Sequence, residues 1–276
     1  MTGVKQDLVA ELVQSGLEVR EARWLVEEFV SGDELDDLPM LYAAAQRRRD
    51  GEPIQYVIGH WPFRTLDLDV DPRVLIPRPE SEELVGVALD ELAKSNVRSP
   101  LIMDLGCGSG AIGLALIREL ADRGVAATLI AVDVSSDALS VARENAIKHD
   151  LHAVSFVRSS WFEDLDESLR GRVDLIVANP PYVGALEFEE LEDVLRHEPH
   201  GAIVANDALG VVGFEDLDLI ISGALDWLSP GGELICEHSN LHRTAALDAA
   251  TRARFDSVDD VDDMAGHPRI LVARRT

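Results

Sequence analysis

Short apolar runs alternate with stretches of helical spacing from about residue 100 onward, and this alternation restricts the fold more than any other feature of the chain. The run 173–178 is nearly all apolar, as expected for a strand that is covered on both faces. Strands that alternate with helices predict a doubly wound, mainly parallel, Rossmann-like α/β sheet. Seven strands are expected, at residues 101–103, 128–132, 154–157, 173–178, 233–236, 255–258 and 269–273.

The first eighty residues follow a different pattern. Leu8, Leu12 and Val13 recur at helical spacing, and no strand pattern occurs before residue 50. Prolines and glycines punctuate residues 51–80, where the alternating segment Phe63–Val70 predicts part of a β-hairpin. We therefore expect a small helical domain at 1–50, a β-hairpin linker at 51–80 and a larger domain at 81–276.

The charge of the chain limits its partners. Asp and Glu number 51 and Lys and Arg number 25, which gives a net charge of −26. This balance argues against a protein that binds mainly through clustered cations to phosphate backbones or to anionic membranes. The chain also lacks the apolar segment of a signal peptide or of a membrane-spanning helix, and its two cysteines cannot form a disulfide framework. We expect a cytoplasmic location and no direct contact with nucleic acid or membrane.

A glycine-rich loop, Asp104–Gly110, separates the first strand of the sheet from the helix that follows it. Glycines let the backbone approach a ligand closely, and the helix N-terminus offers free N–H groups. Asp133 follows the second strand, where a carboxylate can accept hydrogen bonds from both hydroxyls of a ribose. The loop also fits the dinucleotide fingerprint loosely. The acidic Asp104 and the third glycine, Gly110, favour S-adenosyl-L-methionine over NAD, because that ligand has an ammonium group and no pyrophosphate.

The motif Asn179-Pro180-Pro181-Tyr182 follows the fourth strand, at the sheet edge where ligands bind in such folds. The Asn179 side-chain oxygen and the Pro180 carbonyl can accept two hydrogen bonds from one planar NH₂ group, and Tyr182 can lie against its face. This arrangement would hold an amide or exocyclic amine nitrogen for methylation. The glycine loop, Asp133 and this motif together resemble class I S-adenosyl-L-methionine-dependent N-methyltransferases.

Further segments resemble one branch of that class, the release factor glutamine methyltransferases. They are residues 47–54, 75–80, 160–162, 196–199 and 265–269. The resemblance implies methyl transfer to the side-chain amide nitrogen (N5) of the glutamine in the Gly-Gly-Gln motif of peptide-chain release factors. It also implies that residues 1–50 dock the substrate and that residues 81–276 are catalytic. We further expect a monomer.

The site residues that these arguments and the resemblance imply fall into three groups. The catalytic residues are Asn179, Pro180 and Tyr182. Substrate binding is expected from Asn179, Pro180, Pro181, Tyr182 and Arg78. Cofactor binding is expected from Asp104, Gly106, Cys107, Gly108, Ser109, Gly110, Asp133, Trp161 and Asn179.

Alternative interpretations rest on the same motifs. A glutamine methyltransferase of a ribosomal protein fits residues 196–199 and 234–237 equally well, but residues 47–53 and 77–80 favour the release-factor enzyme. A DNA adenine or cytosine methyltransferase would need a basic recognition region, which the sequence lacks. A non-catalytic binding protein would not need residues 179–182. No metal is expected, because the pairs His197/His200 and His238/His242 lack a third ligand at suitable spacing.

Two segments depart from the family pattern. The N-terminal unit is about a dozen residues shorter than expected, near residues 32–38. Residues 187–193 are strongly acidic, which suits either a solvated surface or a contact with a basic release factor. A further acidic run, Asp259–Asp263, is expected to be a solvated loop.

Overall fold

A computed structural model describes residues 3–31, 38–95, 97–189 and 193–276. Its helices are α1 (Gly3–Gln14), α2 (Val19–Phe29), α3 (Leu38–Arg49), α4 (Ile54–Ile58), α5 (Pro79–Lys94), α6 (Ala111–Asp122), α7 (Ser136–Lys148), α8 (Ala185–Phe188), α9 (Glu215–Trp227) and α10 (Arg243–Ala253). Its strands are β1 (His60–Phe63), β2 (Leu66–Asp69), β3 (Leu101–Leu105), β4 (Thr128–Asp133), β5 (Val154–Arg158), β6 (Val173–Ala178), β7 (Leu228–Glu237), β8 (Ser257–Asp262) and β9 (Pro268–Arg274).

Seven of these strands form one twisted sheet in the order β5-β4-β3-β6-β7-β9-β8. The first five in that order are parallel to one another, and β9 runs antiparallel to both of its neighbours. The predicted seven-stranded, mainly parallel sheet is therefore confirmed. The chain leaves β3 in one direction towards β4 and later returns to its other side as β6, so the switch point for ligand binding lies at the carboxyl ends of β3 and β6.

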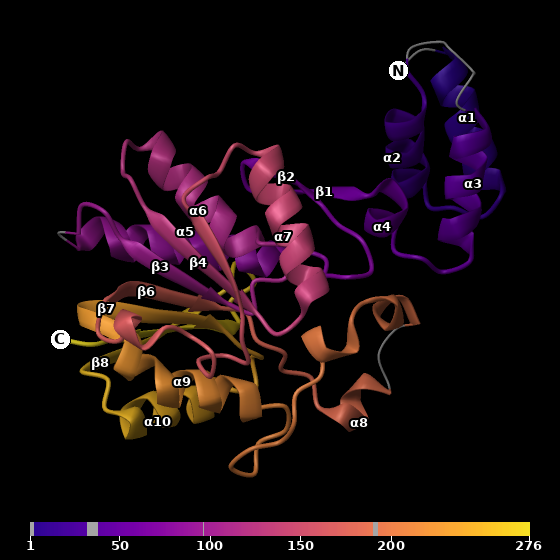
Figure 1. The fold of residues 1–276 in the computed structure, drawn as a ribbon. Coiled ribbons are helices and arrows are strands. Elements are labelled where there is room, and N and C mark those ends of the chain that lie inside the picture. The colour runs from indigo at the N-terminus through magenta and orange to yellow at the C-terminus, as the bar shows by residue number, and fades with distance from the viewer. Residues whose placement is uncertain (1–2, 32–37, 96, 190–192) are drawn as a thin grey trace.

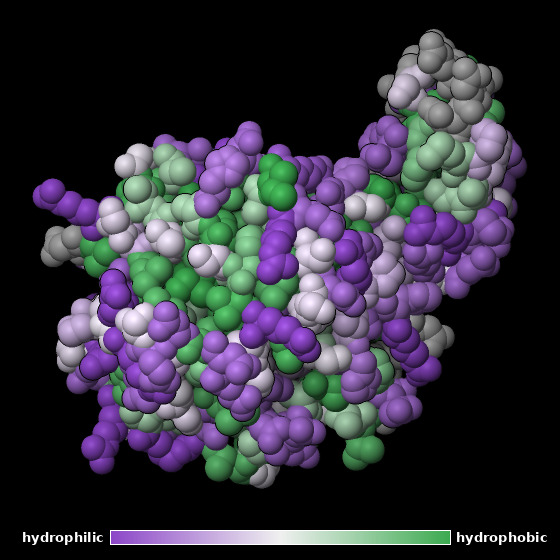
Figure 2. All heavy atoms as spheres, in the orientation of Figure 1, coloured by the Kyte–Doolittle hydropathy of each residue, from purple (hydrophilic) through white to green (hydrophobic). Residues whose placement is uncertain are grey.

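Helices cover both faces of the sheet, as Figure 1 shows: α5, α6 and α7 lie on one side and α9 and α10 on the other. Successive residues of β3 point to opposite faces, so Ile102 packs in the cluster under α5 and α6 and Met103 packs in the cluster under α9. This burial on both faces explains why the strands read as continuous apolar runs. On the surface drawn in Figure 2, hydrophobic residues gather over the middle of the larger body, and hydrophilic residues surround them.

The N-terminal helices project from this body and have a hydrophobic cluster of their own, formed by residues of α1 to α4 (Figure 1). The β1–β2 hairpin instead packs against the larger body, because Phe63, Leu66 and Leu68 belong to the cluster under α5 and α6. Within the described ranges, no helix is long and apolar enough to cross a membrane.

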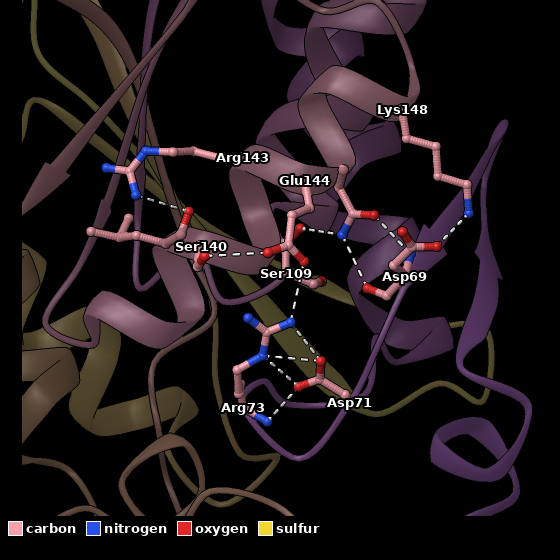
Figure 3. A network of polar contacts seen from close by, with 10 residues as sticks. Asp69, Asp71, Arg73, Ser109, Ser140, Arg143, Glu144 and Lys148 are labelled. Atoms are coloured by element: carbon pink, nitrogen blue, oxygen red, sulfur yellow. Dashed lines mark hydrogen bonds and ion pairs between the residues drawn. The ribbon is translucent and has the colours of Figure 1, made fainter.

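A buried amide attaches the hairpin to the glycine loop. Asn145 of α7 is fully buried; its Nδ2 donates to the carbonyls of Asp69 (3.1 Å) and Ser109 (3.0 Å), and its Oδ1 accepts from the N–H of Asp69 (2.7 Å). Figure 3 shows this contact beside the ion pairs that Arg73 and Lys148 make with neighbouring carboxylates. The stretch 67–73 is therefore held on α7.

Three local expectations were wrong. The acidic run Asp259–Asp263 is not a loop: most of it lies in β8, where Asp260 is buried against His238, with 2.7 Å between the imidazole and the carboxylate. The helix α4 was not foreseen, because a five-residue element carries too little periodicity. Strand β7 starts at Leu228, five residues before the predicted Glu233; the sequence Ser-Pro-Gly-Gly at 229–232 lacks a strand pattern, so this first part was missed.

Candidate active site

A cavity of about 420 Å³ opens at the switch point of the sheet. The loops after four neighbouring parallel strands line it: Gly106 and Gly108 after β3, Asp133 to Ser135 after β4, Ser159 to Trp161 after β5, and Asn179 and Pro181 after β6. Two remote segments, 73–75 and 199–202, complete the wall. A cavity of this size, with apolar walls and a few converging polar groups, suits a small organic ligand.

The glycine loop leaves room for a ligand. Gly106, Gly108 and Gly110 all have positive φ, at 70°, 53° and 83°, a region that other residues rarely adopt. A Cβ at Gly108 would meet no atom within 4 Å, so the backbone there borders open space. A Cβ at Gly106 would lie 3.3 Å from the Trp161 ring, and one at Gly110 would lie 2.8 Å from Leu114. The three glycines thus have different roles. Gly108 lets a ligand approach the backbone, Gly106 packs against Trp161, and Gly110 packs against Leu114 of α6.

Asp133 lines the cavity and also holds the glycine loop. Its Oδ2 accepts from the N–H of Gly108 at 2.9 Å, and its Oδ1 accepts from the N–H of Ser135 at 2.9 Å. Burial raises the pKa of the Asp133 carboxyl, and these backbone hydrogen bonds oppose the rise. Each carboxylate oxygen can accept a second hydrogen bond, so the predicted contact with ribose hydroxyls remains possible in this geometry.

Four predicted cofactor residues do not line the cavity: Asp104, Cys107, Ser109 and Gly110. Asp104 is buried and accepts from the N–H of Gly113 at 2.9 Å, while its Oδ1 has no partner among the described residues. Burial raises the pKa of Asp104 to about 7. Cys107 packs in the hydrophobic core, where burial raises the pKa of its thiol. Ser109 is buried, and its carbonyl is held by Asn145. Their roles in cofactor binding stay predictions.

Trp161 forms one wall of the cavity and is fixed at both ends. Its backbone adopts a positive φ of 46°, and its indole N–H donates to the Asp216 carboxylate at 3.0 Å. Asp216, near the start of α9, also lines the cavity, and burial raises its pKa. The ring lies against Gly106, and its contact with an adenine stays a prediction.

The motif at 179–182 follows β6, the strand paired with the one that precedes the glycine loop. Asn179 and Pro181 line it, whereas Pro180 is buried and Tyr182 is half-buried. The Asn179 Nδ2 donates to the Ser81 hydroxyl at 2.9 Å, and no described donor bonds to Asn179 Oδ1 or to the Pro180 carbonyl. Burial raises the pKa of Tyr182 to about 12, so its phenol is neutral. Two acceptor oxygens are thus available beside the cavity.

Arg78 does not line the cavity. Its guanidinium pairs with the buried carboxylate of Glu198 at 2.5 Å, and the same carboxylate accepts from the N–H of Ile76 at 2.9 Å. Glu198 immediately precedes the wall segment 199–202. The contact between Arg78 and substrate stays a prediction, and the ion pair shows that Arg78 holds the cavity wall in place.

Sequence reasoning missed several residues of the site. Ser81 contacts Asn179 directly, and Glu237 is linked to Asn179 through Ser81. Asp216 holds the ring of Trp161 by a hydrogen bond. The wall segments 73–75 and 199–202 adjoin segments 75–80 and 196–199, which resemble the family. This resemblance was the one sequence signal that pointed to the two wall segments. Ser81 and Asp216 carry no local signal, since their partners lie 98 and 55 residues away in the chain.

The cavity fits S-adenosyl-L-methionine. Open space borders Gly108, an acidic side chain follows β4, an aromatic wall follows β5, and a buried carboxylate oxygen of Asp104 lacks a donor beneath the loop. Together with the sheet order, these features define a methyltransferase of the Rossmann-like class. A family model described as a methyltransferase domain matches residues 99–266.

Curated relatives narrow the class, and the chain belongs to the family of release factor glutamine methyltransferases. It is 37% identical over 248 residues to the release factor glutamine methyltransferase of Aliivibrio fischeri. The aligned residues cover 90% of this chain and 82% of that protein. It is 39% identical to the protein of that name from Yersinia pestis, over 87% of this chain and 81% of the other.

Solved structures share the fold at lower identity. A methyltransferase from Pyrococcus furiosus has a TM-score of 0.51 and 16% identity, over 76% of this chain and 89% of its own. The 16S rRNA N2 G1207 methyltransferase of T. thermophilus, solved with AdoMet and guanosine, has a TM-score of 0.56 and 18% identity, over 79% of this chain and 50% of its own.

Proposed function

We propose that the protein transfers a methyl group from S-adenosyl-L-methionine to the side-chain amide nitrogen (N5) of the glutamine in the Gly-Gly-Gln motif of peptide-chain release factors. The observation that carries the proposal is that Asn179 lines the same cavity as the glycine loop and Asp133, with no described donor on its Oδ1 or on the neighbouring Pro180 carbonyl. The names of the curated relatives supply the substrate.

The two acceptors suit the chemistry of an amide nitrogen. Its lone pair is delocalised into the carbonyl, which makes it a poor nucleophile. Hydrogen bonds from both N–H groups to Asn179 and Pro180 would push electron density back onto nitrogen and fix its direction of attack. The neutral Tyr182 would lie against the planar group. Orientation and electrostatics of this kind contribute several kcal/mol to catalysis.

The loops after β3, β4 and β5 would hold the cofactor. When bound, S-adenosyl-L-methionine supplies an electrophilic methyl group on a sulfonium. Gly106 and Gly108 would let the backbone approach the methionine portion, Asp133 would accept from the ribose hydroxyls, and Trp161 would pack on the adenine. No residue of the cavity is assigned as a general base, and the amide proton leaves to water after transfer.

The alternatives are less well supported. The curated relatives are named for release factors, and neither ribosomal proteins nor DNA appear in those names. We retain as proposals that the protein does not bind nucleic acid directly, that it is a monomer and that it acts in the cytoplasm, where its substrate acts.

We also propose that the chain has three functional parts: residues 1–50, which dock the release factor, the hairpin segment 51–80 and the catalytic domain 81–276. The separate hydrophobic cluster of α1 to α4 supports a distinct N-terminal part, but this cluster extends to Ile58, past the proposed boundary at residue 50. The shortened segment near residues 32–38 falls almost wholly outside the described residues, as do residues 190–192 of the acidic stretch. Contacts of either with a release factor therefore stay predictions.

The experiment is a methylation assay with labelled S-adenosyl-L-methionine and, separately, a release factor, a ribosomal protein and DNA. Label on the Gly-Gly-Gln glutamine is expected, and label on DNA alone would refute the proposal. Asn179→Ala should abolish transfer while leaving cofactor affinity, measured by calorimetry, nearly unchanged. Asn206→Ala, which alters an exposed asparagine outside the cavity, is the matched control.

A further inference from the structure

A chain of three side chains runs from the protein interior to the candidate active site. Glu237 ends β7, Ser81 lies in the first turn of α5, and Asn179 follows β6. The Ser81 hydroxyl donates to Glu237 Oε2 at 2.7 Å, and Asn179 Nδ2 donates to the Ser81 Oγ at 2.9 Å. Ser81 and Glu237 are 4% and 1% exposed, so bulk water does not compete for these bonds.

The order of donors and acceptors in this chain follows from chemistry. Burial raises the pKa of Glu237 to about 7, so the carboxylate is ionised above this pH. In that form it only accepts hydrogen bonds, and a serine hydroxyl has a single hydrogen to give. Ser81 then donates to Glu237, which leaves only a lone pair for Asn179. Only the NH₂ end of the Asn179 amide can meet that lone pair. The amide oxygen is then directed away from Ser81, and Asn179 lines the cavity.

We propose that Ser81 and Glu237 are positioning residues that set the polarity of the Asn179 amide, so that its oxygen faces the substrate and the site selects an amide over a carboxylate. The inference rests on the proposed function, because it assumes that Asn179 receives the glutamine side chain. With Asn179 Oδ1 and the Pro180 carbonyl both accepting, a glutamine NH₂ group satisfies both oxygens. A glutamate in the same place brings only oxygens, which the two acceptors repel.

The same logic explains why position 179 holds asparagine rather than aspartate. A carboxylate there would compete with Glu237 for the single hydrogen of Ser81, and two buried carboxylates would face one donor. If Glu237 became an amide, its NH₂ group could donate to Ser81, and Ser81 could then donate to a carboxylate at 179. The whole chain would run in reverse and still present an oxygen to the cavity.

This reversal provides the test. Steady-state methylation of a release factor is measured for wild type, Asn179→Asp, Glu237→Gln and the double variant. We expect Asn179→Asp to lower kcat/KM at least 100-fold, Glu237→Gln to lower it less than 10-fold, and the double variant to be at least 10-fold more active than Asn179→Asp alone. If the fold-decrease in kcat/KM of the double variant equals the product of the two single-variant decreases, the proposal is overturned.

Thermal unfolding of the same four proteins separates this proposal from the proposed function. The double variant should melt at a higher temperature than Asn179→Asp, whatever the substrate is. If wild type fails to methylate the Gly-Gly-Gln glutamine, the proposed function fails, while the melting temperatures still test the hydrogen-bond chain. Additive changes in melting temperature would overturn the chain even if wild type is active.

A second pair of variants keeps the test sound if Asn179→Asp does not fold. Ser81→Ala frees the amide to rotate, so kcat/KM should fall 10- to 100-fold with unchanged cofactor affinity, and Ser81→Thr should restore it. A release factor with glutamate in place of the Gly-Gly-Gln glutamine should inhibit Ser81→Ala more strongly, relative to wild type. Equal inhibition of the two enzymes, or full activity of Ser81→Ala, would refute the positioning role. Ser140→Ala, on the surface of α7, serves as the control.

Discussion

The guanidinium of Arg78 lies 2.5 Å from the carboxylate of Glu198, which follows it by 120 residues. Because Glu198 is buried and also accepts from the N–H of Ile76, this one carboxylate joins the entry to α5 with the segment that closes the cavity. The ion pair therefore controls the position of residues 199–202, although neither partner lines the cavity.

Arg78→Met should consequently weaken both stability and substrate binding. Removing the cation leaves a buried carboxylate without its charged partner, which costs about 1–3 kcal/mol in the free energy of unfolding. We expect a raised KM for the release factor, measured by steady-state kinetics, and a lower urea midpoint. Lys94→Met removes an exposed ion pair with Glu91 and should leave the urea midpoint nearly unchanged. Equal effects of the two substitutions would contradict the role given to Glu198.

Gly213→Ala should damage the site, whereas Gly210→Ala should not. Both glycines have positive φ, but a Cβ at Gly213 would lie 2.3 Å from the Tyr182 carbonyl oxygen and a Cβ at Gly210 would meet nothing within 4 Å. Both variants bear the backbone strain of about 1–2 kcal/mol, and only Gly213→Ala displaces the turn that carries residues 179–182. Methylation rates at saturating substrates should fall at least tenfold in Gly213→Ala alone. Parallel losses in both variants would mean that strain, not contact with Tyr182, is responsible.

Trp161→Phe should weaken cofactor binding without preventing transfer. The phenyl ring keeps an apolar wall but cannot donate to Asp216, which leaves that carboxylate unpaired beside the cavity. This bond is already present without the cofactor, so its loss, about 1.5–3 kcal/mol, falls on the free energy of unfolding. We expect the Kd of S-adenosyl-L-methionine in calorimetry to rise as well, because the ring that forms the wall is no longer held in place. Trp24→Phe, in α2, should leave that Kd unchanged. An unaltered Kd in Trp161→Phe would argue against an aromatic wall held by Asp216.

Asp104 should make stability depend on pH in an unusual direction. Burial raises its pKa from 3.8 to about 7 in the folded protein, so between these values the folded state binds a proton that the unfolded state does not. The free energy of unfolding must therefore fall as pH rises through this window. The free energy of unfolding of Asp104→Asn does not fall in this way. Its excess over the wild-type value should grow from near zero at pH 4 to as much as about 4 kcal/mol at pH 7.5. Urea titrations at fixed ionic strength measure the difference, and a constant difference across pH would exclude a buried titrating Asp104.

The strands and the loops that follow them could be predicted, because both leave local patterns. The apolar run 173–178 and the glycines at 106, 108 and 110 can be recognised from a few adjacent residues. The topology of the sheet then places the loops that follow the strands at one edge. A proline and acidic residues in the first turn also predict a helix from Pro79 to about Lys94, and α5 spans these residues.

Contacts between distant segments could not be predicted. Ser81 meets Glu237 across 156 residues, and neither residue stands out from other serines or glutamates nearby. Asp260 looked like one member of a solvated acidic run, yet β8 buries it against His238. A solvated acidic run and a run with one buried carboxylate look the same in the sequence. Whether a residue is buried depends on the order of the strands in the sheet and not on its neighbours in the chain.

The place of β9 has a consequence for how the enzyme is made. Residues 268–274 enter the sheet between β7 and β8, although they are synthesised after both. Until they leave the ribosome, β7 has β6 as its single neighbour, and the strand that ends in Glu237 lacks five of its final backbone partners. The nascent chain can therefore assemble its glycine loop early, but the sheet beneath Glu237 is complete only after β9 has been translated.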